Sequence, residues 1–200
     1  MKKWLKKVFE QILPTISYIK ANRTLKEKIE NPDCQSNSSY KANFDQISID
    51  SFRQKYLEAF DTKNKFEDKA KTNVIGITIA ITLITASSGM INTIINRFSF
   101  VWLHWTAFFI LLFAILYLLS AGIVAIKVLF VENTMSVVDL IDLSSDNKDT
   151  KIKYDDCINR NISRNIIRNN LVFASYICIR NALICLIMLL ILMTIPIASV

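Results

Sequence analysis

The chain has 200 residues, of which 52% are hydrophobic and 20% are charged, and its formal net charge is +7. Its charges are segregated along the chain, which excludes an ordinary soluble domain of this length. Three stretches contain no charged side chain, namely residues 74–95, 98–126 and 181–200. A helix needs about 20 residues to cross a bilayer. The sequence therefore predicts an all-α integral membrane protein with three transmembrane helices, a hairpin followed by a C-terminal span.

The positive charges predict the orientation in the membrane. Residues 1–71 carry 15 Lys and Arg, the turn between the first two spans carries one, and residues 127–180 carry eight. Segments rich in Lys and Arg stay in the cytoplasm. We therefore expect a multi-pass protein of the cell inner membrane with its N-terminus inside and its C-terminus outside. The predicted regions are a cytoplasmic helical region (1–71), a transmembrane hairpin (72–127), a second cytoplasmic helical region (128–180) and a last span (181–200).

The basic charge predicts a partner as well. No DNA-binding motif accompanies it, and ten acidic residues are mixed with the basic ones before residue 72. The charge therefore favours anionic headgroups of the lipid bilayer as the partner and argues against nucleic acid.

The N-terminal region predicts an amphipathic helix over residues 2–19. Its apolar residues recur at helical spacing, namely Leu5, Val8, Phe9, Ile12, Leu13, Ile16 and Ile19. Such a helix either lies in the membrane interface, with its lysines at lipid phosphates, or packs on the chain's own second cytoplasmic helix. Pro14 is expected to kink the helix or to end its first part. Residues 31–44 are predicted to form a loop.

A long helix is predicted from Asp50 or Ser51 through the first span, since no helix breaker interrupts it. Ser51 and Gln54 have the spacing of a capping box. An aromatic line follows at i, i+4 and i+8, formed by Phe52, Tyr56 and Phe60. We expect this line to be an interaction face for a partner. Residues 144–150 are predicted to be a loop, and residues 154–180 a helix that continues into the third span.

Side chains that prefer the headgroup level flank the predicted helices and spans. The expected membrane-interface anchors are Trp4, Lys69, Lys71, Trp102, Trp105 and Lys127.

The first span also carries polar and small residues at heptad spacing. This polar seam consists of Thr78, Thr82, Thr85, Gly89, Asn92 and Asn96. In lipid, such residues let helices approach closely and form hydrogen bonds between helices. Three interpretations stay open: packing on the second span, self-association, or a polar pore lining in an oligomer. A threonine hydroxyl also bonds to its own helix, so the pattern alone does not decide between them.

No pattern in the chain predicts an enzyme. The sequence lacks a phosphate-binding loop, a GxSxG elbow and an HExxH pair, so no catalytic, cofactor or metal site is expected. No Asp, Glu, Lys or Arg lies inside a predicted span, which argues against an ion-coupled transporter. Two functions remain: a membrane effector that oligomerises and perturbs the bilayer, or a membrane-anchored module that recruits a partner through its cytoplasmic helices.

A family resemblance supports the first of these functions. The stretch Phe66-Glu67-Asp68-Lys69-Ala70-Lys71 runs directly into the first span, and residues 161–190 combine spaced asparagines with a last span. Both segments resemble the Pycsar-type and SLATT-type membrane effectors of bacterial antiphage systems. The resemblance implies a homo-oligomer in which a cytoplasmic protein or nucleotide acts as the trigger, and whose assembly impairs the inner membrane.

Overall fold

The computed structural model describes residues 11–30, 46–97, 101–130, 134–139 and 147–194, without the side chains of residues 28, 86–97, 101, 147 and 193–194. The described part contains four helices and confirms the all-α prediction. They are α2 (Pro14–Glu30), α3 (Ile49–Arg97), α4 (Val101–Phe130) and α6 (Asn147–Thr194). The predicted loop at residues 31–44 and the anchor Trp4 lie outside the described residues.

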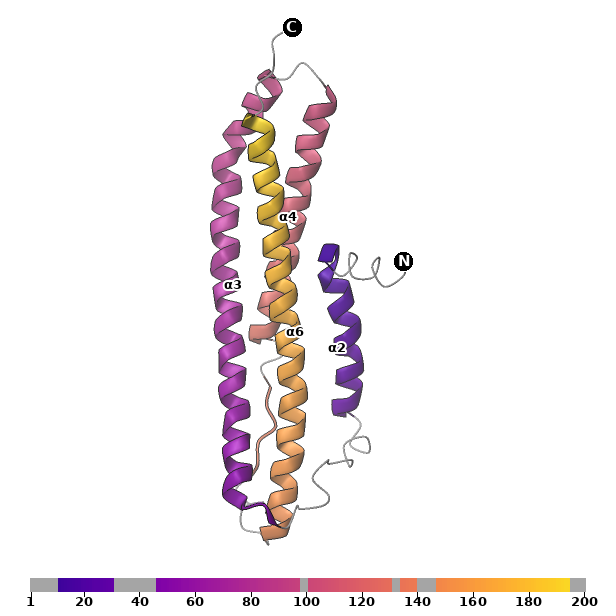
Figure 1. The fold of residues 1–200 in the computed structure, drawn as a ribbon, viewed down its shortest axis with the longest axis vertical. Coiled ribbons are helices and arrows are strands. Elements are labelled where there is room, and N and C mark those ends of the chain that lie inside the picture. The colour runs from indigo at the N-terminus through magenta and orange to yellow at the C-terminus, as the bar shows by residue number, and fades with distance from the viewer. Residues whose placement is uncertain (1–10, 31–45, 98–100, 131–133, 140–146, 195–200) are drawn as a thin grey trace.

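Three long helices lie side by side, and α2 lies along the outside of α6 (Figure 1). Helices α3 and α6 run in the same direction, and α4 runs in the opposite direction and passes behind α6 in the view of Figure 1. Helix α4 accompanies only one half of the α3–α6 pair. Along the other half, residues 134–139 follow the pair without forming a helix (Figure 1). The bundle therefore changes from three helices to two helices and an extended segment.

The helix boundaries follow the expected signals with two corrections. Helix α3 begins at Ile49, and its first turn is capped by Ser48, whose hydroxyl accepts from the Ser51 N–H at 3.2 Å. Ser51 is thus inside the helix and is not its cap. Helix α6 begins at Asn147, so its first turn occupies part of the predicted loop. Pro14 opens α2 after a bend at Leu13, as expected for a proline at the first helical position.

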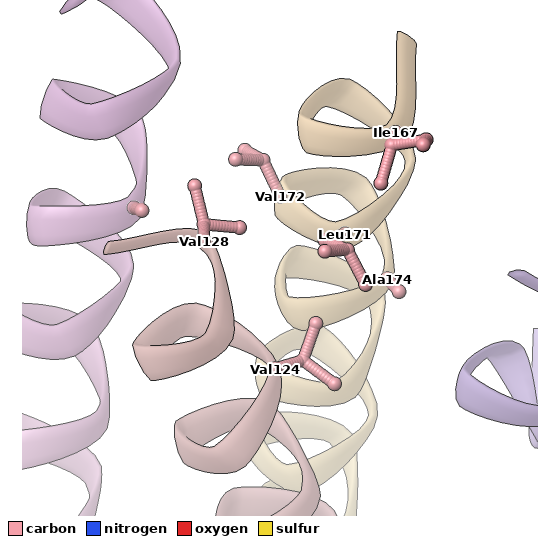
Figure 2. Packing of buried hydrophobic residues seen from close by; sticks show 7 residues of the cluster. Val124, Val128, Ile167, Leu171, Val172 and Ala174 are labelled. Atoms are coloured by element: carbon pink, nitrogen blue, oxygen red, sulfur yellow. The ribbon is translucent and has the colours of Figure 1, made fainter. Parts of the chain in front are cut away.

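Small residues allow the three long helices to pack closely. At successive levels Ala70, Ala80, Ala121, Ala174 and Ala182 are fully buried. Figure 2 shows the level of Ala70 and Ala174, where valines of α4 lie against residues 167–174 of α6. The alanine side chain ends at Cβ, so the backbones of neighbouring helices can approach closely.

Enlarging one of these alanines should destabilise the bundle. Ala80 is fully buried among Leu118 and Ala182. We expect Ala80→Leu to lower the free energy of unfolding by about 1–3 kcal/mol, because overpacking forces neighbouring helices apart. Thermal unfolding in detergent, followed by circular dichroism, measures the change. Ala21→Leu at an exposed position of α2 is the matched control, and an equal loss there would contradict this prediction.

Two described helices are long and apolar enough to cross a membrane, α4 over Trp102–Phe130 and α6 over Lys148–Leu192. The apolar stretch of α3 begins at Val74 and runs past Thr85 into residues whose side chains are not described. Two spanning helices are therefore consistent with the fold, and the third span stays a prediction.

Candidate functional site

One half of the bundle exposes a broad belt of apolar side chains, which we call the apolar band. More than a third of the surface of each of these side chains is exposed: Ile75, Ile79, Ile81, Leu83, Phe108, Phe109, Phe113, Leu116, Leu119, Ile123, Ile126, Leu183, Ile184, Ile187, Met188 and Ile191. A monomeric soluble protein rarely exposes a continuous apolar surface of this extent. The band is the surface that a bilayer would cover.

The five predicted anchors that the structure describes lie at the two edges of the apolar band. Lys69 and Lys71 flank Ala70, which packs in one cluster with Val128, the neighbour of Lys127. These three lysines therefore share one level, which we call the basic collar. At the other edge Trp102 and Trp105 are 64% and 58% exposed. From Lys127 to Trp105 helix α4 rises by about 33 Å, at about 1.5 Å per residue, close to the roughly 30 Å of a hydrocarbon core.

Within the band, the polar seam of α3 faces away from the other helices. Thr78, Thr82 and Thr85 are exposed, and each hydroxyl donates to the carbonyl four residues earlier, at 3.1, 3.0 and 3.0 Å. The opposite face of α3, with Ile77 and Ala80, packs on α4 and α6. The described part of the seam therefore does not pack on the second span, which was one of the three interpretations. The side chains of the remaining seam positions, Gly89, Asn92 and Asn96, are not described.

Helix α2 uses a different face from the predicted one to contact the protein. Tyr18, Leu25 and Ile29 pack on the cluster around Leu171, and the Asn22 side chain accepts from Asn170 at 2.9 Å. The predicted stripe points outward: Ile12, Leu13, Ile16 and Ile19 are 50%, 41%, 56% and 52% exposed. The described part of the stripe is therefore exposed and could contact lipid. The face of α2 that carries Tyr18, Asn22 and Leu25 packs alongside α6 instead (Figure 1).

The chain just before α2 meets polar groups within the apolar band. Arg180 donates to Gln11 Oε1 at 2.6 Å, and Asn181 donates to the Gln11 carbonyl at 2.7 Å. The Tyr117 hydroxyl donates to the Ile12 carbonyl at 3.0 Å. These contacts give Arg180 polar partners where its neighbours are apolar, which lowers the cost of a charge among apolar side chains.

Below the basic collar, side chains of α6 hold the extended segment 134–139. The Asn161 side chain accepts from the Ser136 N–H at 2.7 Å and donates to the Ser136 carbonyl at 3.0 Å. Arg164 donates to Ser136 Oγ at 3.2 Å. An extended segment beside helices has no strand partner, so its buried backbone groups need side chains as partners.

Arg168 is the centre of this polar network and is fully buried. Its guanidinium donates to Asn165 Oδ1 at 2.6 Å, to the Thr134 carbonyl at 2.8 Å and to Met135 Sδ at 3.3 Å. Asn165 in turn donates to the Ala59 carbonyl of α3 at 2.8 Å. The network thus ties together α3, α6 and the extended segment, and it is the most polar part of the described interior.

The aromatic line of α3 lies mostly inside the protein, which corrects its interpretation as a free interaction face. Phe52 is 5% exposed and packs with Tyr154 and Ile158 of α6. The Tyr56 hydroxyl accepts from the Val138 N–H at 3.4 Å, and burial raises the pKa of its phenol. Since α6 and the extended segment cover Phe52 and Tyr56, these two side chains stabilise the fold. Phe60 is half-buried against Tyr56, with ring centroids 5.0 Å apart.

Sequence reasoning missed the polar network. Asn161, Asn165 and Arg168 recur at helical spacing between the apolar residues Ile158 and Leu171, which places polar groups on a buried face. That pattern is the signal that points to the network.

Comparisons with protein-family models, with curated proteins and with solved structures find no match to the chain.

Proposed function

We propose that the chain is an inner-membrane effector that assembles with copies of itself through the polar seam of α3 and thereby perturbs the bilayer. In this proposal the basic collar lies at the cytoplasmic surface, the N-terminus is inside and the C-terminus outside. The resemblance to antiphage effectors suggests a role in defence, with a cytoplasmic protein or nucleotide as trigger.

The observation that carries the proposal is the outward face of α3. Thr78, Thr82 and Thr85 form a hydroxyl-bearing stripe in the middle of an apolar surface, and all three side chains are exposed. In the monomer the Thr78 and Thr82 hydroxyls donate to their own helix, and in a pair of facing copies a hydroxyl that turns away from its carbonyl would donate to the hydroxyl oxygen of the facing threonine. Hydroxyl contacts of this kind support helix association in lipid.

The size of the apolar band supports membrane residence, the first step of the proposal. Between the basic collar and the Trp102 and Trp105 edge, exposed apolar residues continue around α3, α4 and α6. Aromatic residues and lysines at opposite edges suit the two headgroup regions of a bilayer.

Replacing the three seam threonines with valine tests self-association, because valine keeps the shape and removes the hydroxyl. We expect Thr78→Val/Thr82→Val/Thr85→Val to weaken self-association in vesicles by roughly tenfold to twentyfold, at about 0.6 kcal/mol per interhelical hydrogen bond. Energy transfer between labelled copies measures association. A membrane-potential dye during induced expression measures the perturbation of the membrane, which should fall in parallel.

The matched control is Thr62→Val/Thr72→Val/Thr106→Val. These hydroxyls make the same bond to their own helices, at 2.8, 2.9 and 2.9 Å, but lie away from the seam. Association and depolarisation should stay at the wild-type level. Equal effects in both triple variants, or unchanged association in the seam variant, would contradict the proposed interface.

A further inference from the structure

A pocket of about 410 Å³ lies between α2 and the C-terminal end of α4, at the level of the basic collar. Leu171 of α6 lines it, and that residue is 2% exposed in the cluster that contains Val128 and Ala70. Three cationic side chains converge on the pocket, namely Arg23 and Lys26 from α2 and Lys127 from α4.

The pocket is polar at one end and apolar at the other. Helix α2 runs antiparallel to α6, with Asn22 beside Asn170 and Thr15 beside Cys178. Ile19 therefore lies nearer the apolar band than Arg23 or Lys26 does. On the apolar-band side of Lys127, α4 carries Ile126 and Ile123, which are 53% and 68% exposed. An occupant that satisfies both ends must itself be amphiphilic.

The charge of the pocket is positive despite two acidic residues. Glu27 and Glu30 also line it, so three cations face two carboxylates. Glu27 pairs with Arg23 at 3.3 Å, but both side chains are largely exposed, at 60% and 82%. An exposed ion pair of this kind contributes little, so an anionic ligand can replace the carboxylate as the partner of Arg23.

We propose that this pocket binds the phosphate headgroup of an anionic phospholipid. The phosphate oxygens accept from Arg23, Lys26 and Lys127, and the acyl chains lie along the exposed isoleucines of α2 and α4. Basic pockets beside membrane helices at the cytoplasmic surface suit such headgroups. A free phosphate would leave the apolar end of the pocket uncovered. The inference rests on the membrane residence in the proposed function but does not depend on self-association.

Lipid retention tests the inference. The full chain is reconstituted in phosphatidylcholine vesicles with a minor fraction of phosphatidylglycerol and then extracted in mild detergent. Mass spectrometry of the lipids that co-purify gives the enrichment of phosphatidylglycerol over its fraction in the vesicles. We expect clear enrichment for the wild type. Arg23→Gln/Lys26→Gln/Lys127→Gln should abolish it, at about fivefold per cation removed.

The matched control is Arg53→Gln/Lys55→Gln/Lys65→Gln, which removes the same charge from exposed positions on α3 below the collar. It should keep the wild-type enrichment, and an equal loss there would show that only net charge matters and would overturn the proposal. Glu27→Gln should raise the enrichment, which guards against a pocket variant that merely misfolds. No rise with Glu27→Gln would also overturn the proposal.

Two further treatments show whether the lipid site or the membrane residence of the chain is contradicted. If added inorganic phosphate removes the bound phosphatidylglycerol, the pocket selects phosphate without the lipid chains, and the proposal is overturned. If alkaline carbonate strips the chain from the vesicles, membrane residence fails, and with it the proposed function. Retention in the vesicles without enrichment would overturn the lipid site alone.

Discussion

Arg168→Met should destabilise the protein by about 2–5 kcal/mol, because the acceptors of a buried guanidinium would lose their donor. Arg168 is fully buried, and its N–H groups reach Asn165 Oδ1 and the Thr134 carbonyl at 2.6 and 2.8 Å. Methionine keeps the length of the side chain but donates no hydrogen bond. Each acceptor left without a partner in the interior costs about 1–3 kcal/mol. Reversible unfolding in detergent, followed by circular dichroism, measures the loss.

Arg160→Met is the matched control on the same helix. Arg160 is partly exposed and pairs with Asp156 at 3.0 Å, so its removal should cost about 0.2–1 kcal/mol. Equal losses in the two variants would contradict the central role of Arg168.

A double-mutant cycle sharpens the test of this contact. Asn165 accepts from Arg168 and donates to the Ala59 carbonyl, so it belongs to the same network. Asn165→Leu together with Arg168→Met should therefore cost less than the sum of the two single substitutions, with a coupling of about 0.5–3 kcal/mol. Strict additivity would mean that the short Arg168–Asn165 contact contributes nothing to stability.

The continuous helices were predictable from the sequence, because their signals are local. Neither α3 nor α6 contains a proline within its bounds, and the charged and apolar halves of each helix join without a helix breaker. The cap of α3 shows the limit of such signals. Ser48 and Ser51 are three residues apart, and either can cap a helix. The start at Ile49 gives that role to Ser48, whose hydroxyl accepts from the Ser51 N–H.

The path of residues 134–139 was not predictable, because it depends on contacts far apart in the chain. Ser136 meets Asn161, and Val138 meets Tyr56, across 25 and 82 positions. The same cause accounts for the aromatic line. Helical spacing placed Phe52 and Tyr56 on one face, but spacing does not specify whether that face meets α6 or a partner protein.

The direction of the threonine seam also depended on tertiary packing. Thr78, Thr82 and Thr85 share a face by their spacing alone, and packing of that face on the second span was one of the three interpretations. The structure buries Ile77 and Ala80 instead, so the opposite face of α3 meets the bundle. Both faces satisfy the rules of helix packing in lipid, and the bulk and shape of the neighbouring side chains decide between them.

Asn161→Leu should release residues 134–139 from the α3–α6 pair and destabilise the protein by about 2–5 kcal/mol. The fully buried Asn161 side chain bonds both the N–H and the carbonyl of Ser136, at 2.7 and 3.0 Å. Leucine has a similar volume but leaves both backbone groups without that partner. Because none of the described residues forms a strand beside the extended segment, these two bonds replace those of a sheet. Limited proteolysis should cut residues 134–139 faster in the variant, and unfolding in detergent measures the loss of stability.

A graded series separates the two hydrogen bonds. Asn161→Asp keeps an acceptor for the Ser136 N–H but loses the donor to the Ser136 carbonyl, and it buries a carboxyl group in the process. Asn169→Leu changes an exposed asparagine on the same helix and should leave both unfolding and proteolysis near the wild-type values. If Asn161→Leu behaved like Asn169→Leu, the two Asn161 bonds would not be needed to hold the extended segment. We instead expect a small effect at Asn169 and a large one at Asn161. The buried Asn161 amide bonds both the N–H and the carbonyl of Ser136, whereas Asn169 is exposed.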